Sequence, residues 1–564
     1  MKKLLTIIMA ALMLCTSLGA MGCNREQLEG GDDSKSVLNV GVFYAGYGIE
    51  WAKQAEIDFE KLYADVEFED GKKGVDVIID AKKDEFKPSN LLVTMESYEN
   101  AIYFLNQNDF YGFQRNGLLA DITDTLNEKV YDEDGYWAAA TGKPAVTSMN
   151  DIMYEEFEGF YDVEGRTYAA PWSFDCAGII YDADLFDRNR YYFDADGEIG
   201  CNQADIDAGN CGTGPDLTMD TPDDGMPVTW NDFVALMDHM KRGGDNVTPF
   251  IWSGGTQYQK VRAYESIWAN YEGYDDFMLN FSFNGEDAQL GAITPATAGK
   301  LSEQEGIKAA IKAAYDIIDG GYYFGKSFQK SYTEAQTLYI DKDGEAGQVA
   351  MFMEGGYWEI EAIDTFNRMG SLLPSNGFGK RNFKRFPIPN FVDVDGITDQ
   401  TREIMEEPET LIGHAAYKNI ALVTAKNKAK NPELQQRLAK LFLQYVNSRE
   451  QLVNFTAKTG ACIGAYHFDT NEEERNTFTK FGKNIFEYIE NGSKIAIDVP
   501  LHEFRRSNYT DWEDNGRGYF YINENGVGSF ADPFTFFADA SSKTVNDCWS
   551  YMQRQFKELM STCK

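Results

Sequence analysis

Residues 37–43 of the chain read VLNVGVF, a short apolar run that is typical of a buried strand. A helix is predicted directly after it, because apolar residues recur there at spacings of four, four and three: Trp51, Ala55, Phe59 and Leu62. Two further strand-like runs follow, VDVIID at residues 75–80 and AIYFL at residues 101–105. Strands that alternate with helices in this way predict an α/β domain with a mostly parallel sheet.

The later part of the chain continues this alternation. Residues 168–181, YAAPWSFDCAGIIY, are strand-like, and Thr229 is the expected N-cap of a helix. Residues 419–424, NIALVT, form a buried-type strand. The helix after that strand is well signalled, since Asn431 can cap it and Pro432 falls in its first turn.

Composition and charge bound the class of protein. The chain has 564 residues, of which 43% are hydrophobic and 25% charged, so it can bury large cores. Its 52 Lys and Arg against 90 Asp and Glu give a formal net charge of −38. A polyanion of this size repels phosphate backbones, so nucleic acid is not an expected partner.

The N-terminus predicts export. Basic residues at the start precede a mainly apolar run from Leu4 to Leu18, which is shorter than the about 20 residues that a membrane-spanning helix needs. The run ends in Ala20-Met21-Gly22-Cys23, which resembles a bacterial lipobox. We therefore predict a lipoprotein signal peptide over residues 1–22, palmitate-type lipidation of Cys23 and a flexible tether over residues 23–36. Ordinary secretion with an incidental Cys23 is the alternative.

Cysteine usage fits an exported protein. Cys201 and Cys211 bracket a short acidic loop and are the best disulfide candidates, while buried free thiols are the alternative for Cys176, Cys462, Cys548 and Cys563. A zinc site is not expected, because the chain has no C-x-x-C motif and its four His residues are not clustered.

Five groups of segments resemble, in the same order, the extracellular solute-binding proteins of carbohydrate ABC transporters, family 1, the maltose-binding type. Together they cover most of the chain from residue 37 to about residue 464, and the last hundred residues match poorly. The segments are residues 106–109 (NQND) with 117–122 (GLLADI), 168–186 (YAAPWSFDCAGIIYDADLF), 227–233 (PVTWNDF), 347–358 (GQVAMFMEGGYW), and 419–424 with the following helix.

The resemblance implies an α/β, two-lobed periplasmic-binding-protein-like fold with discontinuous lobes and a crossing-strand hinge. The first lobe would hold residues 37–175 with 415–459, and the second residues 180–412 with 462–564. In this topology the segments that carry Cys176 and Cys462 run side by side.

The implied function is the binding of an extracellular sugar, an oligosaccharide, in an interlobe cleft and its delivery to the permease subunits of an ABC transporter. The resemblance implies a monomer that is not an enzyme, needs no cofactor, and lies outside the cytoplasm, attached to the bacterial cell membrane only by its lipid. A surface glycan-binding or glycoside-hydrolysing protein without a transporter partner is the alternative, since sequence cannot exclude a pair of catalytic carboxylates among 90 acids.

Sugars present apolar ring faces that stack on aromatic side chains, and hydroxyls that bind carboxylates and amides. The resemblance gives Trp358 the place of a stacking tryptophan and Asp175 that of a hydroxyl-binding carboxylate. Aromatic residues in loops or in the hinge segment add further candidates: Tyr47, Trp172, Trp252, Tyr258 and Trp512.

Asn108 and Asp109 complete the predicted ligand contacts. They follow the strand at residues 101–105 at its carboxyl end, where α/β sheets place ligands. Core packing is the alternative role for each aromatic residue, and helix or loop capping is the alternative for the polar residues.

An acidic insert runs from residue 194 to residue 224. Asp194, Asp196 and Glu198 resemble the start of an EF-hand loop, and Ca²⁺ prefers such oxygen ligands, so a structural Ca²⁺ site is predicted there. The match fails later in the loop, because Ile199 takes the position of the usual glycine. A solvated acidic loop is the equal alternative.

Overall fold

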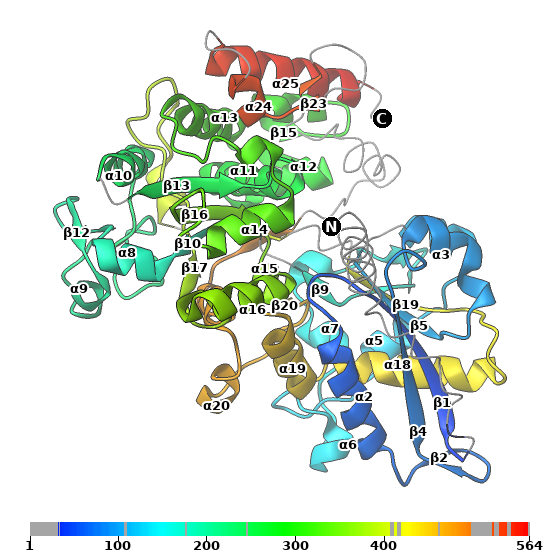
Figure 1. Ribbon diagram of the computed structural model, residues 1–564. Coiled ribbons are helices and arrows are strands. Elements are labelled where there is room, and N and C mark those ends of the chain that lie inside the picture. The colour runs from blue at the N-terminus through cyan, green and yellow to red at the C-terminus, as the bar shows by residue number, and fades with distance from the viewer. Residues whose placement is uncertain are drawn as a thin grey trace, which may run out of the picture.

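The computed structural model describes residues 32, 34–106, 110–174, 177–243, 246–255, 257–406, 411–413, 419–460, 463–497, 522–523, 530–538 and 543–561. Helices and strands alternate along most of them, and Figure 1 shows two groups of elements side by side. Each group is built around its own sheet. The predicted α/β fold with two lobes is therefore what the chain adopts.

The first lobe contains a five-stranded sheet in the order β4-β1-β5-β19-β8. Strand β1 pairs in parallel with β4 and β5, while β19 is antiparallel to both of its neighbours, so the sheet is mixed rather than mostly parallel. The strands are β4 (Val75–Lys82), β1 (Ser36–Phe43), β5 (Ile102–Leu105), β19 (Ile420–Val423) and β8 (Ala170–Pro171).

Two amphipathic helices cover the first sheet. In α2 (Glu50–Leu62) the buried residues include Trp51, Ala55 and Phe59, as their spacing predicted. In α18 (Pro432–Val446) the Asn431 side chain accepts the Leu434 N–H, which satisfies one of the unpaired donors at the helix start. Both predicted helices are thus confirmed.

The remaining elements of the first lobe are short. They are β2 (Glu67–Glu69), β3 (Lys72–Lys73), α3 (Pro88–Thr94), α4 (Phe110–Arg115), α5 (Thr123–Asn127), α6 (Ala138–Thr141), α7 (Met149–Ile152), β6 (Asp162–Val163), β7 (Arg166–Thr167), α19 (Arg449–Thr459) and α20 (Glu472–Arg475).

The second lobe contains a four-stranded sheet in the order β13-β16-β10-β17. Strand β13 is parallel to β16, and β10 is antiparallel to both β16 and β17. The strands are β13 (Val247–Trp252), β16 (Gln348–Glu354), β10 (Gly178–Asp182) and β17 (Phe383–Arg385).

Helices and small hairpins surround the second sheet. The predicted N-cap Thr229 begins α10 and forms a capping box with Asp232. The elements are α8 (Ala183–Asn189), β11 (Tyr192–Phe193), β12 (Ile199–Cys201), α9 (Gln203–Asp207), α10 (Trp230–Arg242), α11 (Gln257–Glu272), α12 (Tyr274–Ser282), β14 (Gly285–Asp287), β15 (Gly291–Ile293), α13 (Glu305–Asp319), α14 (Tyr332–Ile340), α15 (Trp358–Glu361), α16 (Ile363–Leu372), α17 (Arg402–Met405) and α21 (Lys480–Glu490).

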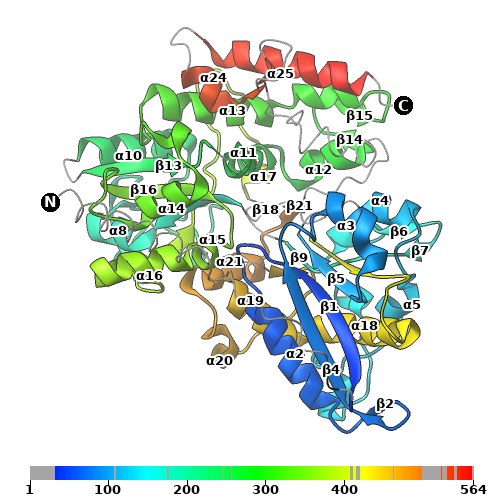
Figure 2. The same ribbon diagram turned by 45° about the vertical axis from the view of Figure 1, so that its right-hand side comes forward.

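The C-terminal elements are β22 (Ile522–Asn523), β23 (Phe530–Ala531), α24 (Pro533–Ala538) and α25 (Val545–Met560). They lie on the outside of the second lobe beside α13 (Figures 1 and 2). The Trp549 indole donates to the Ser302 carbonyl, and Lys557 pairs with Glu303. The described part of the last hundred residues that resembled no family segment therefore includes a helical cover for the second lobe.

Two strand pairs lie where the chain passes between the lobes. Strand β9 (Ser173–Phe174) follows β8 of the first sheet, precedes β10 of the second, and pairs antiparallel with β20 (Ile463–Gly464). Strand β18 (Leu411–Gly413), which precedes β19, pairs in parallel with β21 (Ile495–Ile497). Cys176 and Cys462 lie outside the described residues, but their segments pair at Phe174 and Ile463.

The structure differs from the predicted lobe boundary at residue 462. Tyr466 bridges to Met153, its hydroxyl donates to the Pro171 carbonyl, and Glu474 accepts from Arg449. Residues 463–475 therefore pack on the first lobe, because the pair of β20 with β9 keeps the chain there. Within the described ranges, no helix is both long and apolar enough to cross a membrane.

Candidate functional site

The carboxyl ends of the three parallel strands in the first sheet lie at one edge. Strands β1, β4 and β5 end there at Phe43, Lys82 and Leu105. Open α/β sheets bind ligands at this edge, because the loops that follow the strands gather there. The loop after β1 carries Tyr44, which is 51% exposed, and the predicted ligand residue Tyr47.

Tyr47 joins a group of aromatic rings at this edge. Its ring centroid lies 5.7 Å from that of Trp172 in an edge-to-face arrangement, and Trp172 in turn stacks on Trp51 at 5.0 Å. The Trp172 indole donates to the Leu105 carbonyl at 2.9 Å, which anchors the ring at the end of β5. Both Tyr47 and Trp172 are buried in this structure. Two residues that we predicted independently as ligand contacts are thus neighbours in the fold.

The second lobe meets this edge through α15 and the residue before it. The Tyr357 ring lies 6.0 Å from Tyr47, edge to face. Gly46 approaches Glu361 so closely that a Cβ on Gly46 would lie 2.6 Å from Glu361 Oε1. We call Gly46, Tyr47, Tyr357 and Glu361 the lobe junction.

Glu361 is the polar centre of the lobe junction. Its carboxylate accepts a hydrogen bond from Gln336 Nε2 at 2.7 Å. Burial raises the pKa of Glu361, while the Gln336 hydrogen bond and the nearby Lys83 charge act to lower it. Aromatic rings from both lobes and a hydrogen-bonded carboxylate thus meet at one point, which is the chemistry that sugar recognition uses.

Trp252 and Trp358, which we predicted to stack on ligand, are core residues in this structure. Each ring is 0% exposed. Trp358 begins α15 and packs against Phe383 and Phe366, and Trp252 packs against Phe534. A stacked sugar needs an exposed ring face, so the core-packing alternative describes both residues here.

The side chains of six predicted residues lie outside the described part of the chain. Tyr258 lies in the first turn of α11, where only the main chain is described. Other predicted residues lie outside the described residues: Asn108, Asp109, Asp175, Trp512 and the lipidation site Cys23.

The acidic insert is organised by its own hydrogen bonds. One Asp194 oxygen accepts the backbone N–H groups of Asp196 and Glu198, at 2.9 and 3.0 Å, and so closes a turn. Arg190, which precedes the insert, pairs with Asp205 at 2.8 Å and offsets part of its charge. Across the part of the chain that the structure describes, no three His, Cys, Asp or Glu side chains gather as metal ligands. The predicted Ca²⁺ site gains no support from this arrangement.

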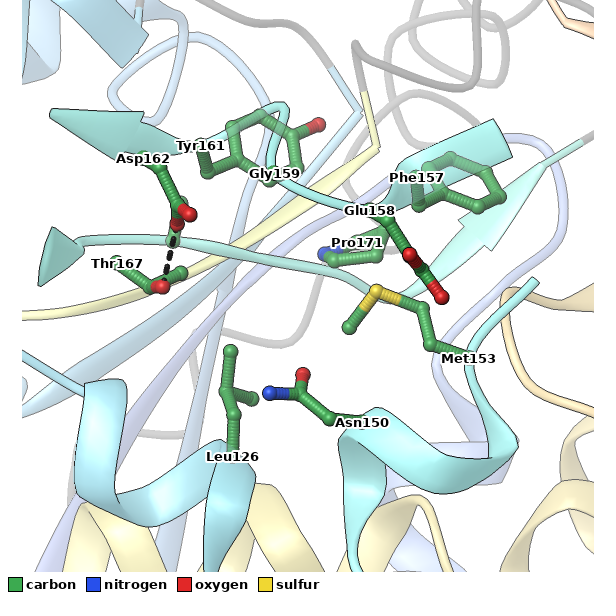
Figure 3. Close-up of a pocket in the computed structure, with 11 residues that line it drawn as sticks. Leu126, Asn150, Met153, Phe157, Glu158, Gly159, Tyr161, Asp162, Thr167 and Pro171 are labelled. Carbon is green, nitrogen blue, oxygen red and sulfur yellow. Dashed lines mark hydrogen bonds between the residues drawn. The ribbon is translucent and has the colours of Figure 1, made fainter. Parts of the chain in front are cut away.

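A separate hollow of about 270 Å³ lies in the first lobe (Figure 3). Leu126 and Asn150 border one side, and Asp162 with its hydrogen-bond donor Thr167 borders another. None of the predicted ligand contacts that the structure describes lines this hollow. The described residues that line it all belong to the first lobe, so a ligand held by them would not bridge the two lobes.

Sequence reasoning missed polar residues at the ends of the second-lobe strands. Glu354 at the end of β16 and Arg385 at the end of β17 are both buried. The motif around Glu354 had been noted only for its tryptophan. Arg385 carries no motif at all.

Solved structures share this fold. A probable secreted solute-binding lipoprotein from Streptomyces coelicolor matches 93% of this chain and 100% of its own, at 12% identity and a TM-score of 0.52. A chitin oligosaccharide binding protein matches 94% of this chain and 100% of its own, at 14% identity and a TM-score of 0.51.

A third structure is that of the bacterial solute receptor AcbH, described as having an exclusive preference for β-D-galactopyranose. It matches 94% of this chain and 98% of its own, at 12% identity and a TM-score of 0.50. No protein-family model and no curated protein matches the chain. The chain therefore has the fold of the bacterial solute-binding receptors.

Proposed function

We propose that this protein binds an extracellular oligosaccharide between its two lobes and delivers it to the permease subunits of an ABC transporter. The shared fold supports the proposal, since structures with this fold include a chitin oligosaccharide binding protein and a galactopyranose receptor. The protein acts as a monomer, catalyses no reaction and requires no cofactor.

The observation that carries the proposal is the lobe junction. Tyr47 lies at the carboxyl edge of the first sheet and Tyr357 directly after the carboxyl end of the second-lobe strand β16. In this structure their rings contact each other. The strand pairs β9–β20 and β18–β21 form the hinge, and bending there separates the two rings so that a sugar ring fits between them. Gln336 and Glu361 then face its hydroxyls.

Calorimetry of the full-length chain with a panel of neutral oligosaccharides tests the proposal. Saturable binding is expected for at least one of them, without release of products. Tyr357→Ala removes one stacking face. It should weaken that binding by about 0.5–1.5 kcal/mol in addition to the free energy lost with the buried apolar area. Tyr332→Ala is the matched control, because Tyr332 is an exposed tyrosine of α14. Hydrolysis of the sugar would favour the glycosidase alternative. If no oligosaccharide of the panel binds, the proposed function is refuted.

We also propose that Cys23 is lipidated and holds the protein on the outer face of the cytoplasmic membrane. The basic start, the short apolar run and the cysteine at its end support this. One neighbour in fold is a probable secreted lipoprotein. Mass spectrometry of the mature N-terminus should find a lipid-modified Cys23, and an unmodified cysteine would contradict the tether.

A further inference from the structure

Arg385 is a buried cation with no carboxylate of the described residues within ion-pair distance. Its side chain is 1% exposed, and neither Nε nor Nη1 finds a hydrogen-bond partner within the described part of the chain. Its other terminal nitrogen, Nη2, donates to Ser266 Oγ at 3.4 Å. Among the residues that the structure describes, Arg385 makes no ion pair. Burial of a charge is strongly unfavourable unless the charge is paired and hydrogen-bonded.

The neighbouring Arg381 shows how this fold stabilises a buried arginine. Its guanidinium pairs with Asp182 and donates to the carbonyls of Tyr339 and Ile340 at 3.0 and 3.1 Å. Arg381 is thus matched by a countercharge and by acceptors, whereas Arg385 is not. Of the two buried arginines among the described residues, Arg385 is the one without such a match.

The fold holds Arg385 at the end of the second sheet. Its backbone N–H donates to Asn484 Oδ1 at 2.7 Å, and it pairs with Ile180 in β10. The guanidinium occupies the space above Gly178, where any Cβ would overlap it. Gly178 is the first residue of β10, so Arg385 lies where the chain enters the second lobe.

Strand register places Glu354 on the same side of the sheet. Glu354 pairs with Gly178 and Arg385 pairs with Ile180, and residues two apart in a strand face the same way. One Glu354 oxygen accepts the Gly355 N–H at 3.0 Å. A guanidinium and a carboxylate on one face suit a ligand with both an acidic group and hydroxyls, rather than a bare anion.

We propose that Arg385 binds an acidic group, a carboxylate or a sulfate, on the oligosaccharide ligand. The inference rests on the proposed function and names the substrate class as acidic oligosaccharides. Opening of the lobes exposes the guanidinium, and the bound acid supplies the countercharge that the described residues lack. Hydroxyls of the same sugar then donate to Glu354.

The test compares matched ligands on the full-length chain by calorimetry. A uronate-containing trisaccharide, its carboxyl-reduced neutral counterpart and a sulfated trisaccharide serve as probes. At least one acidic probe should bind about 10- to 100-fold more tightly than the neutral one, as expected for a charge-assisted hydrogen bond. Tighter binding of the uronate or of the sulfate identifies the acidic group. Equal or tighter binding of the neutral probe overturns this inference and leaves the proposed function standing.

Two variants test whether Arg385 is the residue that causes the preference for acidic ligands. Arg385→Gln should remove the preference for the acidic probe while binding of the neutral probe persists. Lys384→Gln is the matched control, because Lys384 is the adjacent cation and its Nζ donates to Gln203 instead. A preference that survives in Arg385→Gln, or disappears in Lys384→Gln, overturns the assignment. If Arg385→Gln does not fold, the comparison of probes on the unmodified chain still decides the substrate class.

Discussion

Replacement of Gly46 by alanine should shift the two lobes apart. The new Cβ would lie 2.6 Å from Glu361 Oε1 and 2.9 Å from Glu361 Cβ, whereas ordinary contacts begin at 3.4 Å. The difference between 3.4 and 2.6 Å requires a retreat of about 0.8 Å. Overpacking of this kind costs about 1–3 kcal/mol. Because Gly46 and Glu361 belong to different lobes, opening relieves the strain without unfolding either lobe.

A cost of about 1–3 kcal/mol changes the ratio of closed to open molecules by about 5- to 150-fold. Because the proposed site admits a sugar only when the two rings are apart, sugar affinity should rise by up to that factor, and small-angle scattering without sugar should show a larger radius of gyration. Gly325→Ala is the control, since no atom lies within 4 Å of a Cβ there. Glu361→Ala added to Gly46→Ala removes the overlap and should return the radius of gyration toward that of the unmodified chain. Unchanged affinity and unchanged scattering in Gly46→Ala would refute the contact between the lobes.

Three further predictions follow from buried groups. Trp358→Ala should lower the free energy of unfolding by about 3–5 kcal/mol in a denaturant titration, because the ring fills the second-lobe core. Burial raises the pKa of Glu359 to about 7, so the stability it contributes is complete below pH 4.5 and is lost as pH rises to about 7. Glu359→Gln should therefore flatten the fall in stability between those values, which a series of melts would detect. Cys201 and Cys211 are buried free cysteines in this structure, but their side chains lie within hydrogen-bond distance of each other, so oxidation after export should bridge them, which nonreducing peptide mass spectrometry would detect.

Local sequence patterns predicted much of the fold. The helices that begin after Thr229 and Asn431 were predicted from capping chemistry that acts within three residues, and both form as expected. Strand direction was harder, because β19 comes more than 300 residues after β5 and its antiparallel return depends on long-range pairing. No local pattern encodes that direction.

The candidate site was predicted less well for a related reason. Tyr47 and Trp172 lie together because each ends or follows a strand of the same sheet edge. Trp252 and Trp358 carry the same sequence signal, an aromatic residue near glycines after a strand. Their rings turn inward because Phe534, 282 residues after Trp252, and Phe383, 25 residues after Trp358, complete hydrophobic clusters around them. Aromatic residues after strands therefore indicate the region where a ligand could bind. Tertiary contacts decide which of these rings has an exposed face for a ligand.

Arg385 shows the same limit for charged residues. In the sequence, Lys384-Arg385 looks like a short exposed basic pair. Adjacent residues of a strand face opposite sides, so β17 directs Lys384 toward Gln203 and Arg385 toward Gly178. Only the pairing of Arg385 with Ile180, about 200 residues earlier, makes one of these charges internal. Burial of this cation is unfavourable, and the described residues supply no ion-pair partner for it. We therefore look for the acidic partner in the ligand.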